Sequence, residues 1–258
     1  MSRTWMITGV SSGFGYEMTR QLLEKGDSVI GTVRNTKTDV TEMEKVHAFI
    51  REMFEKHGRI DVVVNNAGYG LFGAAEELDE ENIYKILDTN LTAPIMIIHD
   101  SLPYLRRQGG GRIIQLSSYG GQVAFPANSL YHATKFGVEG FCESVAQEVA
   151  KFNIGVTIVE PGGARTEFRY GSAHVANLMP EYDHVHGFLN MLDKSKGLAP
   201  GDPAKMAARM IESVDKDPAP LRMVLGSQAL AATIQRLEER IADYKTQTEL
   251  AASTDVTE

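Results

Sequence analysis

The sequence TGVSSGFG, residues 8–15, decides the fold of this 258-residue chain. It follows a short apolar run over residues 4–8 and precedes a helical pattern over residues 16–25, so it joins a buried strand to a helix. Glycines at such a turn let backbone N–H groups approach a pyrophosphate at the positive end of the helix. The glycine spacing differs from the common G-x-G-x-x-G pattern, so the match is one of mechanism. A glycine-rich turn without a ligand is the alternative.

Strand and helix patterns alternate along the rest of the chain. Strands are expected at 28–33, 61–64, 112–116, 154–159 and 221–225, and helices at 41–57, 79–108, 131–152, 203–213 and 229–245. Because no repeat or second domain interrupts this alternation, residues 1–258 are predicted to form one α/β domain with a Rossmann-type, doubly wound parallel sheet. Residues 167–200 lack periodicity and follow the carboxyl end of a strand, where a substrate lid would lie. The C-terminal segment 229–258 is predicted to be a helix followed by a weakly ordered tail from Thr246.

Composition excludes several classes of protein. The net charge of −8 argues against a nucleic-acid binder. The single cysteine, Cys142, cannot form an intrachain disulfide and is expected to pack in a helix. No signal peptide and no apolar run of membrane-spanning length is seen, so we expect a cytoplasmic protein. The histidines of the lid fit no metal-ligand spacing, which favours a solvated loop and predicts no metal site.

The end of the second predicted strand indicates which dinucleotide would bind. An acidic residue there would bind the ribose 2′-hydroxyl of NAD, whereas an arginine suits the 2′-phosphate of NADP. Val33 occupies the expected acidic position and Arg34 follows it. The sequence therefore favours NADP(H) over NAD(H), and the alternative is an arginine that merely borders a loop.

A strand is missing from the expected pattern after Arg34. A parallel crossover normally needs about a dozen residues or more, but only residues 35–38 separate Arg34 from Asp39. The sequence leaves two alternatives open: the third strand, at the sheet edge, and its crossover helix are absent, or a segment is missing from this sequence. On either alternative the catalytic half of the domain is unaffected.

Polar residues with catalytic potential follow the later strands. Tyr131 and Lys135 lie four residues apart, one turn along the same face of a predicted helix. A nearby ammonium lowers the pKa of a phenol from its usual value near ~10, although a solvated helix face would show the same spacing. Ser118 ends the strand at 112–116. Pro94 cannot donate to the carbonyl of Asn90, so this carbonyl could hold a water that relays protons toward Lys135; an ordinary helix kink is the alternative.

Together these motifs resemble the short-chain dehydrogenase/reductase family over nearly the whole chain. They are TGVSSGFG (8–15), DVT (39–41), NNAG (65–68), Asn90, Ser118, YHATK (131–135) and PGGART (161–166). The resemblance implies a sheet of order 3-2-1-4-5-6-7 and a catalytic tetrad of Asn90, Ser118, Tyr131 and Lys135. Of two adjacent serines, Ser118 carries the role because the family's serine lies thirteen residues before the tyrosine.

The resemblance also implies the residues that bind the cofactor. They are Gly9, Ser11, Ser12, Gly13, Phe14, Gly15, Arg34, Asp39, Val40, Asn65, Ala67, Gly68, Tyr131, Lys135, Pro161, Gly162, Ala164 and Thr166. Asp39 resembles the acceptor of the adenine amino group. For the amides at 65 and 66, holding the end of the sheet and meeting a ribose are equally open.

These features predict an NADP(H)-dependent oxidoreductase that interconverts a carbonyl and an alcohol. The aromatic and methionine residues of the lid favour a hydrophobic ketone or aldehyde as substrate, and NADP preference favours reduction. An NADP-dependent epimerase or dehydratase is an alternative reaction type, and a nucleotide-binding sensor or scaffold without turnover is an alternative class. The resemblance implies a homodimer or homotetramer built partly on the helix that contains Tyr131.

Overall fold

The sheet is a doubly wound parallel sheet, as predicted. A computed structural model describes residues 2–33, 42–196 and 198–256. Its six-stranded sheet has the order β2-β1-β3-β5-β6-β8, with every pair parallel. The strands are β1 (Thr4–Ile7), β2 (Ser28–Gly31), β3 (Val62–Asn65), β5 (Gly111–Leu116), β6 (Ile154–Pro161) and β8 (Arg222–Leu225). Within the described residues, β2 forms the edge at which the family's third strand was expected. Residues 34–41, where that question arises, lie outside the described part.

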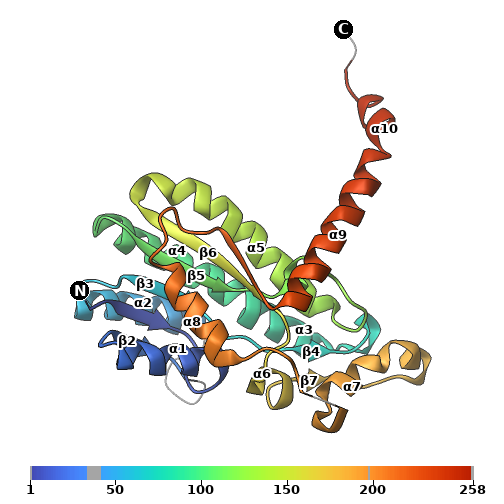
Figure 1. The fold of residues 1–258 in the computed structure, drawn as a ribbon, viewed down its shortest axis with the longest axis horizontal. Coiled ribbons are helices and arrows are strands. Elements are labelled where there is room, and N and C mark those ends of the chain that lie inside the picture. Colours follow the sequence, from blue (N-terminus) through green and yellow to red (C-terminus); the bar gives the residue numbers. More distant parts are fainter. Residues whose placement is uncertain (1, 34–41, 197, 257–258) are drawn as a thin grey trace.

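Helices cover both faces of this sheet (Figure 1). On one face, α2 (Met43–His57), α4 (Ala93–Arg107) and α5 (Ser129–Val149) bury an aliphatic core against the strands. On the other face, α1 (Gly13–Glu24) and α8 (Pro203–Ser213) bury a second core that includes Trp5. Cys142 is fully buried in the first core, which confirms its predicted packing role. Because successive strand residues point to opposite faces, each continuous apolar strand serves both cores.

The predicted break in the helix over residues 79–108 is confirmed. The segment forms α3 (Glu80–Leu87), a π-helical turn (Asp88–Thr92) and α4. Pro94 lacks an N–H group, so the regular helical bond to the carbonyl of Asn90 cannot form. A π-helical turn forms at the place where this regular hydrogen bond is missing.

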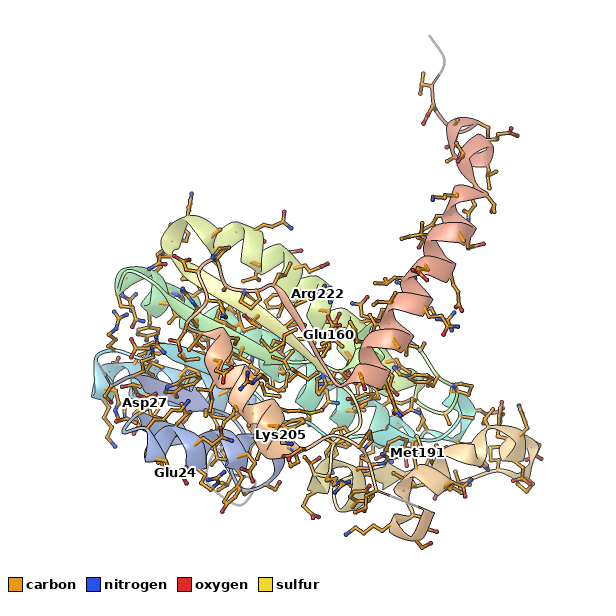
Figure 2. The ribbon with its side chains drawn as sticks, viewed as in Figure 1. Glu24, Asp27, Glu160, Met191, Lys205 and Arg222 are labelled. Carbon is orange, nitrogen blue, oxygen red and sulfur yellow. The ribbon has the colours of Figure 1, made fainter. Side chains whose placement is uncertain are left out.

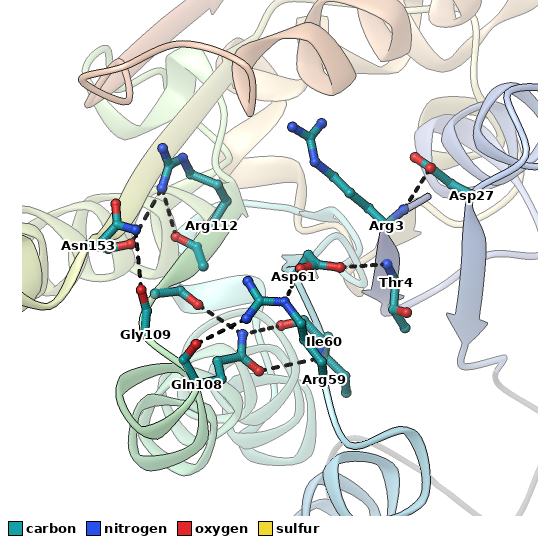
Figure 3. A network of polar contacts seen from close by, with 12 residues as sticks. Arg3, Thr4, Asp27, Arg59, Ile60, Asp61, Gln108, Gly109, Arg112 and Asn153 are labelled. Carbon is teal, nitrogen blue, oxygen red and sulfur yellow. Dashed lines mark hydrogen bonds and ion pairs between the residues drawn. The ribbon is translucent and has the colours of Figure 1, made fainter. Parts of the chain in front are cut away.

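A polar network closes the amino ends of the strands, at the edge opposite the carboxyl ends (Figure 3). Asp61 accepts hydrogen bonds from the N–H of Thr4 at 2.9 Å and from Arg59 Nε at 2.6 Å. Asp27 accepts from the N–H of Arg3 at 2.9 Å and from Trp5 Nε1 at 3.0 Å. These side chains satisfy backbone groups at the start of β1, where the sheet ladder ends.

The lid segment, residues 167–200, is built from short elements. They are α6 (Glu167–Tyr170), β7 (His174–Val175), a 3₁₀ stretch (Pro180–Phe188), α7 (Leu189–Leu192) and a 3₁₀ turn (Lys194–Lys196). β7 pairs with β4 (Leu71–Phe72), and the buried carboxylate of Glu77 accepts from the N–H of Met179 at 2.6 Å. His186 Nε2 lies 2.7 Å from Glu77 Oε1. The prediction of solvated histidines is therefore wrong for His186, because a buried acid on another element binds it.

The C-terminal segment is also more regular than predicted. Helix α9 (Ser227–Lys245) is followed by α10 (Thr248–Ala252), so the tail after Thr246 is helical where weak order was expected. Both helices project away from the body of the domain (Figure 1). Among the described residues, no helix combines the length and the apolar character that crossing a bilayer requires.

Candidate active site

A cleft of about 1120 Å³ lies at the carboxyl ends of the strands, below the lid. Open α/β sheets bind their ligands at this edge. Most predicted site residues line it: Gly9, Ser11, Ser12, Gly13, Phe14, Ala67, Gly68, Ser118, Tyr131, Lys135, Pro161, Gly162, Ala164 and Thr166. The fold thus brings together motifs that are more than 150 residues apart in the sequence.

The glycine loop has the geometry of an anion-binding turn. Gly9 and Gly13 have φ angles of +74° and +57°, which favour glycine. A Cβ atom on Gly15 would lie 2.1 Å from the carbonyl oxygen of Gly9, so only glycine lets the helix start this close to the strand. Gly15 itself does not line the cleft; it allows the other loop residues to do so.

Asn66 holds this loop in place. Its Nδ2 donates to the carbonyl oxygens of Thr8 and Gly9, both at 2.9 Å. Thr8 Oγ1 in turn accepts from the N–H groups of Asn66 and Ala67, both at 3.0 Å. Of the two roles left open for this amide, the structure shows the holding of the sheet end.

The residues present fit a dinucleotide. Helix α1 begins at Gly13 with no side-chain hydrogen bond from Ser12 at its N-cap, and its first residues border the cleft. The N–H groups of an uncapped first turn are suited to bind a pyrophosphate. Because Gly9 and Gly13 carry no side chain, the backbone of the loop can approach a pyrophosphate closely.

Three predicted catalytic residues meet in the middle of the cleft. Tyr131 and Lys135 lie in the first two turns of α5, and Ser118 caps the 3₁₀ turn Tyr119–Gly121. Lys135 Nζ donates to the carbonyl oxygen of Leu116 at 2.9 Å and lies 5.7 Å from the centroid of the Tyr131 ring. Ser118 Oγ accepts from the N–H of Gly120 at 3.0 Å, and its own proton is directed to the Tyr131 hydroxyl, where a substrate oxygen would also lie.

Burial is the largest influence on the pKa values of Tyr131 and Lys135. It raises the pKa of Tyr131 to about 12, against a smaller lowering by a hydrogen bond with Ser118. It also lowers the pKa of Lys135 to about 8. The predicted lowering of the tyrosine pKa by Lys135 is therefore not found, because desolvation disfavours the charged form of both groups. As a result, Tyr131 is a neutral phenol near neutral pH and can donate a proton.

Asn90 lies behind the cleft and does not line it. Its Nδ2 donates to the carbonyl oxygen of Tyr69 at 2.8 Å, and its Oδ1 accepts from the N–H of Tyr69 at 3.1 Å. The side chain thus fixes the backbone that follows the NNAG motif. The water relay through the Asn90 carbonyl stays a prediction.

A buried acidic cluster lies behind the two serines. Glu139 accepts from Ser117 Oγ at 2.5 Å, from Arg222 Nη1 at 2.6 Å and from Gln122. Arg222 also contacts Glu160 at 2.5 Å, and both residues are labelled in Figure 2. Burial and the charge of Glu139 raise the pKa of Glu160. The hydroxyl of Ser117 therefore donates its proton to Glu139. This is consistent with the prediction that Ser118 is the catalytic serine.

Sequence reasoning did not identify this cluster. Its one available signal was the spacing of Tyr131, Lys135 and Glu139, which puts Glu139 on the same helical face. Glu139 lies too far along the helix to reach the cleft directly, but its charge opposes the lowering of the Lys135 pKa.

The outer part of the cleft is lined largely by aromatic and aliphatic side chains. They are Tyr69, Phe72, Tyr119, Phe125, Phe168, Val185, Phe188, Met191 and Leu192. The Phe168 ring lies 5.8 Å from the Tyr131 ring, so this apolar region begins next to the phenol. Polar exceptions include His174, His184 and Arg169. The sequence had indicated this wall only through the aromatic, methionine and histidine residues of the lid, residues 167–200.

Some predicted cofactor residues lie elsewhere. Asn65 is buried, and its Nδ2 donates to the carbonyl oxygen of Pro94 at 3.0 Å and to Gln115 Oε1 at 3.1 Å, so it ties β3 to its neighbours. Arg34, Asp39 and Val40 fall outside the described residues. Within the described part of the chain, no group of acidic, histidine or cysteine side chains is arranged to hold a metal ion.

Comparison with known proteins shows the family to which the chain belongs. A family model described as short chain dehydrogenase matches residues 31–174. The chain is 35% identical to Oxidoreductase BOA17 of Botryotinia fuckeliana, over 89% of this chain and 91% of that one. It is 34% identical to a 3-ketodihydrosphingosine reductase of Bacteroides thetaiotaomicron, over 86% and 87%.

A crystal structure gives the same result for the fold. A short-chain dehydrogenase from Streptomyces avermitilis superposes with a TM-score of 0.92 at 34% identity, covering 99% of this chain and all of that one. The predicted family, and with it the parallel α/β fold, is confirmed. The chain belongs to the short-chain dehydrogenase/reductase family of oxidoreductases.

Proposed function

We propose that the protein is an NADP(H)-dependent oxidoreductase that reduces a hydrophobic ketone or aldehyde to an alcohol. One observation carries this proposal: a neutral phenol, Tyr131, stands between a serine hydroxyl, a buried ammonium and an apolar cavity. This arrangement can bind a carbonyl and protonate it beside an apolar wall.

The cofactor would be held by the glycine loop, by the turn at 161–166 and by Lys135. Since one of the three ammonium protons of Lys135 bonds the Leu116 carbonyl, two remain for the ribose hydroxyls. When bound, the dinucleotide supplies the hydride. NADP over NAD rests on Arg34, whose guanidinium suits a 2′-phosphate.

The protein's own groups perform the proton chemistry. Ser118 Oγ donates a hydrogen bond to the substrate carbonyl oxygen and polarises it. Tyr131 then donates its phenolic proton as negative charge develops on that oxygen. The ammonium of Lys135 stabilises the resulting phenolate. Asn90 keeps the adjoining Tyr69 backbone in position and is proposed to continue the path by which Tyr131 regains its proton.

The outer cleft supports a hydrophobic substrate. Aromatic and aliphatic groups dominate its wall, and burying such a substrate there gains about 25 cal/mol for each Å² of apolar surface. The name of one relative, 3-ketodihydrosphingosine reductase, also describes reduction of a ketone. The oxidation of an alcohol is the same reaction in reverse, and a high ratio of NADPH to NADP favours reduction.

A turnover assay with matched variants tests the proposal. NADPH consumption is followed with a panel of hydrophobic ketones and aldehydes, with NADH in parallel. Tyr131→Phe should reduce kcat by roughly 10²- to 10⁴-fold, the usual contribution of a general acid, and leave NADPH binding intact. Tyr84→Phe removes an exposed phenol on α3 and serves as the control. Tight NADPH binding with no turnover of any carbonyl would instead identify a sensor or scaffold.

A further inference from the structure

Helix α9 contacts the domain along only one of its sides. Ala229 and Thr233 are buried at its start. Arg240 Nη2 donates to the carbonyl oxygen of Gln122 at 3.3 Å, and its guanidinium lies 5.9 Å from the centroid of the Phe136 ring. Beyond these contacts the helix extends away from the body (Figure 1). The adjoining side of α9 faces solvent.

That solvent-facing side carries an apolar row, which we name the α9 stripe. It consists of Leu230, Ile234, Leu237, Ile241 and Tyr244, with exposed fractions of 46%, 48%, 37%, 52% and 62%. The residues are separated alternately by four and three positions, which is the a/d spacing of a coiled coil. Scattered apolar residues are normal on a surface, but a continuous row of this length marks an interaction site.

We propose that the α9 stripe pairs with the α9 stripe of a second copy of this chain, in antiparallel orientation about a two-fold axis. A row with a/d spacing is complementary to another helix that carries the same row. In a two-fold interface each copy presents the same patch to the other. One stripe on each copy is therefore sufficient to form the interface.

Charges beside the stripe determine the orientation. With Ile234 and Ile241 at a positions, Glu238 and Lys245 occupy e positions and Arg240 a g position. Parallel pairing sets g against e, which leaves Glu238 without an opposite charge, because it would face Thr233 of the partner subunit. Antiparallel pairing sets e against e, and Glu238 then faces Lys245 of the partner subunit twice. The charges at the e positions are complementary in the antiparallel arrangement only, and Arg240 at its g position stays bound to Gln122 and Phe136 of its own domain.

The same charges argue against a membrane as the occupant. Helices that lie on membranes carry a polar face rich in Lys and Arg. The polar face of α9 mixes Arg236 with Glu239 and Asp243, and the whole chain has a net charge of −8. An anionic lipid surface would repel such a protein.

The first test measures the mass of the full-length chain by light scattering after gel filtration. The parent protein should be an assembly, and Leu237→Glu with Ile241→Glu should halve its mass. Gln235→Glu with Ala242→Glu adds the same charge on the exposed side outside the stripe and should leave the mass unchanged. The cleft lies on other elements, so all variants should keep their NADPH binding and the circular dichroism spectrum of the folded chain. A monomeric parent, or a stripe variant of unchanged mass, would overturn the proposal.

The second test addresses the orientation by exchange of charges. Glu238→Lys alone places two lysines opposite each other at both ends of an antiparallel pair. It should raise the dissociation constant by roughly fivefold, since each exposed pair contributes about 0.5 kcal/mol. Adding Lys245→Glu should restore the parental value. If the single exchange has no effect, or the double exchange does not restore association, antiparallel pairing is refuted.

Discussion

Replacing Lys135 with methionine gives a direct measure of how strongly this site is desolvated. Burial lowers the pKa of the lysine from 10.5 to about 8. At 1.36 kcal/mol per pH unit, keeping the ammonium charged at neutral pH costs the folded protein about 3 kcal/mol. Methionine removes this cost but leaves the Leu116 carbonyl without its donor, which costs about 1–3 kcal/mol. At pH 7 the variant should therefore equal or exceed the parent in stability, although it loses turnover.

The pH dependence of stability separates the cost of the buried charge from the cost of leaving the Leu116 carbonyl without a donor. Between pH 8 and 10.5 the unfolded chain keeps the proton on this lysine while the folded chain loses it. Stability rises with pH wherever the unfolded state binds more protons. The parent should therefore gain about 3 kcal/mol relative to Lys135→Met across this window. Other titrating groups are common to both proteins, so the difference between them isolates Lys135.

The assay is urea unfolding of parent and variant at a series of pH values from 7 to 10.5. Lys205→Met removes an exposed lysine of α8 (labelled in Figure 2) and should show no such window. A difference between parent and Lys135→Met that stays constant across the window would show that the ammonium is well solvated, and the reasoning from burial would fail.

Three further predictions follow from the site. The kcat/KM for carbonyl reduction should fall above pH about 8, because Lys135 then loses the charge that binds the ribose. Tyr131, with a pKa of about 12, stays protonated over this range. A pH profile that is flat to pH 10 would contradict this prediction. Gly15→Ala should abolish NADPH binding, since its Cβ would lie 2.1 Å from a backbone oxygen, whereas Gly140→Ala, with nothing within 4 Å, should fold and bind normally in calorimetry. Arg222→Met should destabilise the fold by about 3–5 kcal/mol in denaturant unfolding, because two buried carboxylates lose their cation; a loss below about 1 kcal/mol would contradict this.

The sheet and the position of the site could be predicted because they depend on short-range patterns. Apolar runs, the glycine loop and the pair Tyr131 and Lys135 are each visible within a few residues. The strand order then follows from the right-handed crossover rule and the family resemblance. The choice of Ser118 over Ser117 came from spacing alone and stays a prediction; the hydrogen bond between Ser117 and Glu139 depends on contacts that spacing does not reveal.

What the sequence could not provide depends on contacts between distant segments. The direction of the Tyr131 pKa shift was wrong because a spacing of four residues reveals proximity but not desolvation. The acidic cluster requires Arg222 to lie beside Glu139, and these residues are 83 positions apart. In the same way, the binding of His186 to Glu77 crosses 109 positions.

The bond between Glu77 and the lid has a consequence for how a substrate enters. Glu77 fastens the lid near its middle, at Met179 and His186, while the Tyr170 hydroxyl accepts from the N–H of Ala199 at 3.0 Å near its end. A segment fastened at its centre cannot swing open as one flap. We therefore expect the movable part of the lid to be residues 187–196, which carry Phe188 and Met191, because the pairing of β7 with β4 holds residues 174–176 in place. A long, narrow substrate would then enter past this stretch while the rest of the lid stays closed.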